Sequence, residues 1–208
     1  RIRFTTSHPN EMNDHLIDCF GNIKKLANHL HLPIQSGSDK VLMAMKRNYT
    51  TLEYKSIIKK LRKKLPNVSL TTDLIIGFPT ETTNDFNLTK KLFIELDFDY
   101  SFSFIYSKRP GTPAAYLKDE TTDVEKLERL REIQSLNIKQ GECYTKKMIG
   151  TTHRVLIDHF SKKKPGVLLG KTDNNRIIEF KDSKDLLNKF VNVKVMKILG
   201  KSLVGELV

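Results

Sequence analysis

The stretch "HLPIQSGSDKVLMAM", from His31 to Met45, places a short apolar run directly before four small or polar residues and a helical pattern. Ser38 is a suitable N-cap for the helix predicted in "DKVLMAMKR". A buried strand followed by a polar turn and a helix is the repeating unit of parallel α/β folds. The stretch therefore predicts one such unit.

The same alternation of strand and helix continues on both sides of this stretch. Short β-rich or apolar runs predict strands in "IRFTT", "HLPIQ", "LTTDLIIGF" and "YSFSFIYS". The helices between and after them begin at residues suited to capping: Thr50 with Glu53, Thr82, and Thr122 with Glu125. This order predicts a parallel sheet with right-handed crossovers, and four strands are too few to close a barrel.

The pattern changes near residue 145. Five closely spaced strands are predicted in "RVLID", "GVLLGK", "RIIEF", "FVNVKVMKI" and "SLVGELV", with turn sequences such as "KKKPG" and "TDNN" between several of them. In the fourth, Val191, Val193 and Val195 alternate with Asn192 and Lys194. We therefore predict two domains, an α/β domain over residues 1–145 and a small antiparallel five-stranded, OB-like barrel over 146–208.

The chain is basic, and the charge is unevenly distributed. Its 36 Lys and Arg against 24 Asp and Glu give a net charge of +12. Residues 146–208 hold 14 basic and 6 acidic residues, so this last third of the chain contributes +8. Such an excess favours a nucleic-acid partner, although a solvated surface that keeps the protein soluble explains composition alone equally well.

Cysteine use and hydropathy narrow the class of protein. Cys19 and Cys143 lie far apart and show no metal-ligand spacing, which predicts free thiols in a reducing compartment, by default the cytoplasm. No apolar run reaches the length of a membrane helix. The chain opens at Arg1 within a strand-like segment, so we expect it to be part of a longer protein.

Polar loops follow all four predicted parallel strands: "TSHP", "QSGS", "GFPTE" and "SKRPGTP". They should gather at the carboxyl ends of the strands, where parallel α/β folds bind ligands. There Gly77 would let a ligand approach the backbone, and Gln35, Ser36 and Ser38 would offer polar groups. The alternative is turn chemistry, in which Ser38 only caps a helix and the glycines only permit tight turns.

The motifs "RIRFTTSHP", "HLPIQSGSDKVLMAMKRNYT", "DLIIGFPTET" and "SFSFIYSKRPGTPAA" occur in an order that resembles the radical S-adenosylmethionine (SAM) domain of the methylthiotransferase family. The tail, with "GKTDNNRIIEF", "KFVNVKV" and "SLVGE", is similar to the TRAM domain that follows in that family. The resemblance covers essentially the whole chain. It implies a partial TIM-type barrel, represented here by its third to sixth strands.

The resemblance also implies an activity. Members cleave SAM reductively with a 4Fe–4S cluster, and the resulting radical activates a C–H bond of the isopentenyl-modified adenosine next to the tRNA anticodon, where a methylthio group is installed. It implies two 4Fe–4S clusters in the full-length protein, an electron donor such as flavodoxin or ferredoxin, tRNA as partner and a monomer. The residues that it places near SAM are Gln35, Ser36, Ser38, Gly77, Phe78, Tyr106 and Ser107. The alternation in "YSFSFIYS" predicts that the small Ser103 and Ser107 face inward and leave room for this ligand.

Some residues depart from the family pattern. Asp73 stands where a glycine is usual, Thr80 replaces another frequent glycine, and Glu81 comes one place late. The cluster-binding CxxxCxxC motif is absent, and neither Cys19 nor Cys143 can replace it. The six histidines show no ligand spacing. We therefore assign no catalytic residue and no metal ligand to this chain, which is expected to be inactive alone.

The tail supplies the candidate RNA contacts. Lysines and arginines would neutralise phosphates and two asparagines could reach base edges; the set is Arg154, Lys162, Lys163, Lys164, Lys171, Asn174, Asn175 and Arg176. Three alternatives stay open at this point. They are a methylthiotransferase that acts on threonylcarbamoyl-adenosine in tRNA or on a ribosomal protein, a non-catalytic RNA-binding module, and an unrelated TIM-type enzyme for a phosphorylated metabolite.

Overall fold

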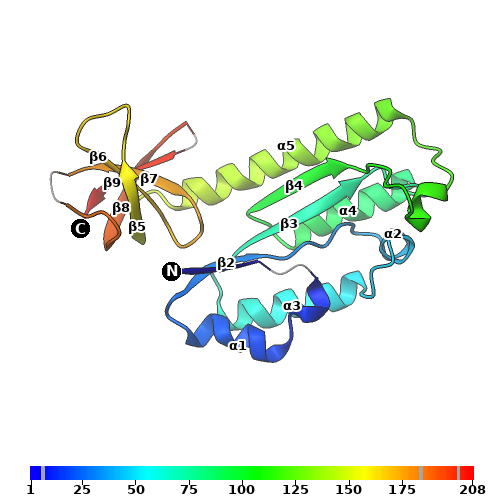
Figure 1. Ribbon diagram of the computed structural model, residues 1–208, viewed down its shortest axis with the longest axis horizontal. Helices are drawn as coiled ribbons and strands as arrows, with labels where there is room; N and C mark the ends of the chain where they lie inside the picture. Colours follow the sequence, from blue (N-terminus) through cyan, green and yellow to red (C-terminus); the bar gives the residue numbers. More distant parts are fainter. Residues whose placement is uncertain (6–7, 183–184, 201) are drawn as a thin grey trace.

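The computed structural model describes residues 1–5, 8–182, 185–200 and 202–208. It consists of an α/β domain and a small β-barrel, and the long helix α5 (Asp123–Lys147) runs from the first to the second (Figure 1). Among the described residues, no helix combines the length and the apolar character needed to span a membrane.

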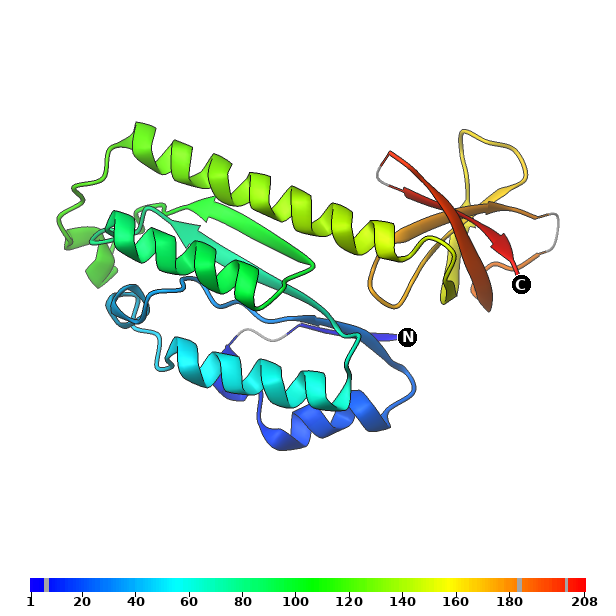
Figure 2. The same cartoon turned by 180° about the vertical axis from the view of Figure 1, so that it is seen from behind.

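The α/β domain is built on a four-stranded sheet in the order β1 (Ile2–Thr5), β2 (Leu26–His31), β3 (Ser69–Ile76) and β4 (Tyr100–Ile105). All neighbouring strands are parallel. Between the strands come the helices α1 (Asp14–Asn22), α2 (Asp39–Ala44), α3 (Thr51–Lys64) and α4 (Thr83–Glu95), and the short 3-10 helices η1 (Pro9–Glu11) and η2 (Pro113–Tyr116) precede α1 and α5. The predicted open parallel sheet is confirmed, and Figure 2 shows the same arrangement from behind.

The helix starts follow the sequence closely. Thr50, Thr82 and Thr122 each accept a hydrogen bond from the third residue of their helix, and the acidic side chain at that position bonds back to the cap. Ser38 caps α2 in the simpler way, by accepting from the amide of Val41. Each cap satisfies backbone N–H groups that the first turn of a helix leaves unpaired.

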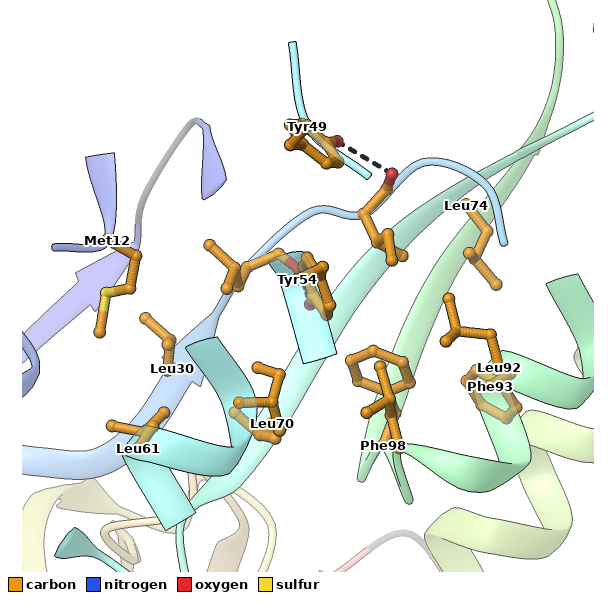
Figure 3. Close-up of a cluster of buried hydrophobic side chains, with 14 of the residues drawn as sticks. Met12, Leu30, Tyr49, Tyr54, Leu61, Leu70, Leu74, Leu92, Phe93 and Phe98 are labelled. Carbon is orange, nitrogen blue, oxygen red and sulfur yellow. Dashed lines mark hydrogen bonds between the residues drawn. The ribbon is translucent and has the colours of Figure 1, made fainter. Parts of the chain in front are cut away.

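The core of this domain lies between the helices and one face of the sheet. Leu30, Leu70 and Leu74 from the strands are at most 1% exposed and pack with side chains of α3 and α4 (Figure 3). The hydroxyl of Tyr49 donates to the carbonyl of Ile34 at 3.0 Å, so a polar group enters this core without losing its hydrogen bond. Complete burial of one such leucine contributes about 2 kcal/mol.

One predicted strand was misplaced, and one helix was missed. The second strand is not "HLPIQ" but the preceding Leu26–His31, and α1 was not predicted. Pro33 has no N–H to donate and Gln35 has a φ of 73°, so the apolar run after His31 leaves the ladder and retains only an isolated bridge from Gln35 to Leu74.

The orientation of β4 also differs from the prediction. Ser101, on the same face as Ser103, is 3% exposed, and its backbone exchanges hydrogen bonds with the side chain of Asn137 on α5. Phe102 and Phe104, 48% and 56% exposed, occupy the opposite face of the sheet, which no helix covers among the described residues. The small serines therefore allow α5 to pack closely, and aromatic rings line the open face.

The second domain is a closed barrel of five strands. They are β5 (Thr152–Phe160), β6 (Val167–Lys171), β7 (Ile177–Lys181), β8 (Phe190–Leu199) and β9 (Ser202–Leu207), in the order β5-β6-β7-β9-β8. Val193 and Val195 are fully buried within it, as the alternation in β8 predicts. The pairing is antiparallel except between β7 and β9, which are parallel, so the expectation of a purely antiparallel barrel is corrected.

Candidate functional site

The loop after β2 contains three of the predicted SAM contacts. The hydroxyl of Ser38 donates to Asp85 Oδ1 at 2.7 Å, and that of Ser36 lies 3.4 Å from the hydroxyl of Thr89. Ser36 and Ser38 are 0% and 1% exposed. Both hydroxyls thus contact side chains of α4. Ser38 also caps α2, which is the structural role that the sequence offered as an alternative to ligand binding. A SAM contact by these two residues stays a prediction.

Gln35 connects this loop to the sheet. Its amide donates to the carbonyl of Asp73 and its carbonyl accepts from the amide of Ile75, both at 2.9 Å. Its left-handed φ of 73° is uncommon for a residue with a side chain and costs on the order of 1 kcal/mol or more. The β3 contacts hold this turn, so the backbone at the carboxyl end of β2 is fixed.

The loop after β3 is organised by a buried ion pair. Glu81 is 3% exposed, and its Oε1 accepts from Arg129 at 2.8 Å and from the amide of Gly77 at 3.0 Å. Burial raises the pKa of Glu81 against the opposing effect of these hydrogen bonds. Its Oε2 is buried and has no hydrogen-bond partner among the described residues.

Gly77 is required by a neighbouring side chain. Its φ is +67°, and a Cβ at this position would lie 2.4 Å from Cγ of Lys126, which itself pairs with Asp119 at 2.5 Å. The group that approaches the Gly77 backbone closely is therefore the side chain of Lys126, which belongs to the protein itself. Whether a ligand also approaches this backbone stays a prediction.

Phe78 and Tyr106 lie together beside this loop. Their rings meet edge to face, with centroids 5.0 Å apart, and the amide of Tyr106 donates to the carbonyl of Ile76. The Tyr106 hydroxyl is buried and has no partner within the described part of the chain. A polar ligand could satisfy this hydroxyl, which fits the predicted SAM site better than the serines do. Ser107 lies just after β4 and is exposed.

A cavity of about 1190 Å³ lies between the open face of the sheet, the second half of α5 and the barrel. His29, His31 and Thr71 line it, together with the aromatic rings of Tyr100 and Phe102. Burial, reinforced by the charge of Arg3, lowers the pKa of His29 to about 4. The histidine is therefore neutral at physiological pH. Its position beside a cavity has no local signal in the sequence.

The predicted RNA contacts fall into separate groups. Lys162, Lys163 and Lys164 occupy the loop before β6, and Asn174, Asn175 and Arg176 occupy the loop after it. The five residues of β6 separate these loops by about 16 Å, because a strand rises about 3.3 Å per residue. Lys171 is exposed at the end of β6, and Lys164 pairs with Glu179 at 2.6 Å.

Arg176 connects the two domains. Its guanidinium forms two hydrogen bonds with the carboxylate of Asp99, at 2.5 and 2.8 Å, and its Nε donates to Thr145. Asp99 is 2% exposed and also accepts from Ser69. Asn174 nearby contacts Thr172 and Met148. An RNA contact by Arg176 stays a prediction, and it would compete with this ion pair.

Comparison with protein families identifies both domains. Residues 1–93 match the model described as the radical SAM superfamily, and residues 146–208 match the TRAM domain. The chain thus matches a radical SAM model in its α/β domain and the TRAM model in its barrel. Coproporphyrinogen III oxidase (HemN) from Escherichia coli, whose structure is described as that of a radical SAM enzyme, aligns with a TM-score of 0.56 and 18% identity over 83% of this chain and 46% of its own, which supports the fold.

Relatives that share one name match this chain over essentially its whole length. The tRNA-2-methylthio-N(6)-dimethylallyladenosine synthases of Methylobacillus flagellatus, Nitrosospira multiformis and Cellvibrio japonicus are 55%, 52% and 50% identical to this chain over 208, 206 and 209 residues. These matches cover 99–100% of this chain and 44–47% of the relatives. The chain therefore spans about half the length of the relatives it matches.

Radical SAM chemistry uses SAM together with an iron–sulfur cluster, which cysteine thiolates hold. Cys19 and Cys143 are both free, and no group of three His, Cys, Asp or Glu side chains that could hold a metal ion occurs within the described ranges. A role of the residues at the carboxyl ends of the strands in binding SAM stays a prediction.

Proposed function

We propose that the protein containing this chain is a radical SAM methylthiotransferase that converts N6-dimethylallyladenosine in tRNA to its 2-methylthio derivative. The observation that carries this proposal is identity of 50–55% to enzymes of that name, continuous through both domains. A protein that shared only the radical SAM fold would have no reason to match in the TRAM domain as well. The anticodon stem-loop of tRNA is the partner, and the cytoplasm is the compartment.

SAM and its cluster would supply the radical that activates the C–H bond, and this chain would supply part of the surrounding site. The fixed turn at Gln35, the aromatic pair of Phe78 and Tyr106 and the unsatisfied Tyr106 hydroxyl would contact SAM. We further propose two 4Fe–4S clusters in the full-length protein, held outside this chain, and reduction by flavodoxin or ferredoxin. The enzyme would act as a monomer.

The test is complementation. The full-length gene is expressed in a bacterium that lacks its own 2-methylthio-adenosine synthase. Nucleosides from digested tRNA are then separated by chromatography and identified by mass spectrometry. We expect the 2-methylthio form of the dimethylallyl nucleoside to reappear. The proposal would be contradicted if the dimethylallyl nucleoside accumulated without its methylthio group while the full-length protein was present and carried its clusters. Modification of the threonylcarbamoyl nucleoside instead would reassign the substrate.

A further inference from the structure

A second, smaller cavity of about 230 Å³ lies where the start of the sheet meets the barrel. Four basic residues line it, together with one acidic, one aliphatic and one aromatic residue. They are Arg1, Lys24, Lys25 and Arg154, then Asp173, Leu26 and Phe190. It is distinct from the loops at the carboxyl ends of the strands and from the lysine loop 161–166. An excess of cations around a cavity of this size suits a phosphate group and its sugar.

The topology explains why these residues meet. The amide of Ile2 donates to the carbonyl of Lys25, which places Lys24 and Lys25 beside Arg1 at the start of β1. Arg1 reaches the barrel, where it pairs with Asp173 at 2.6 Å and donates to the carbonyl of Arg154 at 2.9 Å. Residues from both domains therefore form one continuous surface.

Three of these cations are uncompensated. Asp173 neutralises Arg1, whereas Lys24, Lys25 and Arg154 are exposed and have no ion pair within the described part of the chain. Like charges that are held close together repel one another, and a surface that only needs to stay solvated gains nothing from concentrating them. An anion bound between them would remove this repulsion.

Phe190 positions the arginine. Its partner across the ladder is Leu156, so Arg154 is a diagonal neighbour, and the Arg154 guanidinium lies 3.9 Å from the centroid of the ring. Arg1 lies 5.2 Å from the same centroid. Phe190 is 38% exposed, so it contributes little to the barrel core. Stacking on an aromatic ring fixes the plane of a guanidinium and leaves its N–H groups free to form a fork with a phosphate.

We propose that this surface, formed by Lys24, Lys25, Arg154 and Phe190, binds the phosphate backbone of the RNA substrate across the two domains. The inference rests on the proposed function and adds a contact site that includes the radical SAM region as well as the TRAM domain. Because Phe190 is already covered by guanidinium groups, the surface contacts phosphates and does not stack a base. Its contribution to binding is therefore independent of sequence and sensitive to salt.

The test measures binding of a fluorescein-labelled tRNA anticodon stem-loop to the 208-residue chain by fluorescence anisotropy over a series of salt concentrations. The Lys24→Gln/Lys25→Gln variant should bind more weakly, and the slope of log affinity against log salt should fall by about one to two. The matched control is Lys59→Gln/Lys91→Gln, which removes two exposed lysines of α3 and α4 that form no ion pair with any described residue. The control should retain the wild-type slope.

Two further variants separate charge from geometry. Arg154→Lys keeps the charge but loses the planar fork, and Phe190→Leu keeps an apolar side chain but loses the ring, so each should weaken binding by several-fold while circular dichroism stays native. Equal slopes for both lysine variants, or absence of salt-dependent binding by the wild-type chain, would overturn the proposed surface. Such a result would leave the proposed function intact if the full-length protein still restored the 2-methylthio nucleoside in cells.

Discussion

Folding keeps the imidazole side chain of His29 neutral. It is 7% exposed on the open face of the sheet, where Arg3, His31 and Arg176 add positive charge and Asp99 adds negative charge. Burial is the largest effect and lowers its pKa from 6.5 to about 4. Between these values the unfolded chain binds more protons than the native protein, so stability should rise with pH.

We predict that acidification from about pH 6.5 to about pH 4 removes on the order of 3 kcal/mol of stability through His29 alone. In urea titrations across this window, His29→Gln should be less sensitive to pH than the wild type. His15→Gln, at an exposed position on α1, controls for the substitution itself. Equal pH dependence in all three proteins would show that folding does not lower the pKa of His29.

Residue-level roles were the least predictable part of the site. Ser36 and Ser38 have the polar side chains that a ligand loop requires, and only the structure shows that their hydroxyls face α4. The pairing of Glu81 with Arg129 joins residues 48 positions apart and has no local sequence signal. Thr80, in contrast, occupies a position where the family often has glycine, and its φ of 83° gives the physical reason.

At the scale of elements, the start of α4 holds the start of α2 in place. Asp85 Oδ1 accepts from Ser38, and Oδ2 accepts from the backbone and hydroxyl of Thr82 and from Lys40. Burial alone would raise the pKa of Asp85, but these hydrogen bonds outweigh it and lower the pKa to about 2. The carboxylate thus stabilises the protein above about pH 4, and this contribution is lost as pH falls toward 2.

We predict that Asp85→Asn lowers the free energy of unfolding at neutral pH by about 2 kcal/mol, because an amide oxygen cannot replace both carboxylate oxygens. The difference from the wild type should shrink as pH falls toward 2, measured by urea unfolding. Glu125→Gln is the matched control, since Glu125 forms the same capping box on α5 but is exposed. Equal losses for both variants would mean that the link from α4 to α2 contributes nothing.

Elements were predicted well where local chemistry decides them. The caps at Ser38, Thr50, Thr82 and Thr122 were read from residue type and spacing, and all are present. The second strand was misplaced because the apolar run "LPI" is buried without being part of the ladder. Periodicity reports burial, and it does not distinguish a strand from an extended segment packed beside one.

At the scale of the molecule, the parallel sheet and the five-stranded barrel follow from alternating and clustered patterns, but the parallel pairing of β7 with β9 and the contact between the domains do not. Arg1, Arg3 and Arg176 all reach across to the other domain, and their partners are mostly carbonyl groups. Backbone acceptors carry no sequence signature. Arg176 was accordingly predicted as an RNA contact, and its pairing with Asp99 could only be seen in the structure.

The ion pair between Asp99 and Arg176 should set the orientation of the barrel. The side chains of Asp99 and Arg176 are 3% and 16% exposed, so removal of one partner leaves the other charge buried and unpaired. We predict that Arg176→Met destabilises the protein by about 3–5 kcal/mol and separates its unfolding into two transitions. Asp99→Asn/Arg176→Met should lose less than the sum of the two single variants, by about 1–3 kcal/mol.

Calorimetry of the four proteins in this cycle tests the coupling, and small-angle X-ray scattering tests the orientation. A domain that is released should increase the radius of gyration of Arg176→Met. The matched control is Arg154→Met, which removes an exposed arginine of the same domain that has no carboxylate partner among the described residues. Strictly additive losses and an unchanged radius would mean that the arginine contacts of Arg1 and Arg3 position the barrel without Arg176. The RNA surface proposed above would then depend on those two residues, because it requires the start of the sheet and the barrel to stay together.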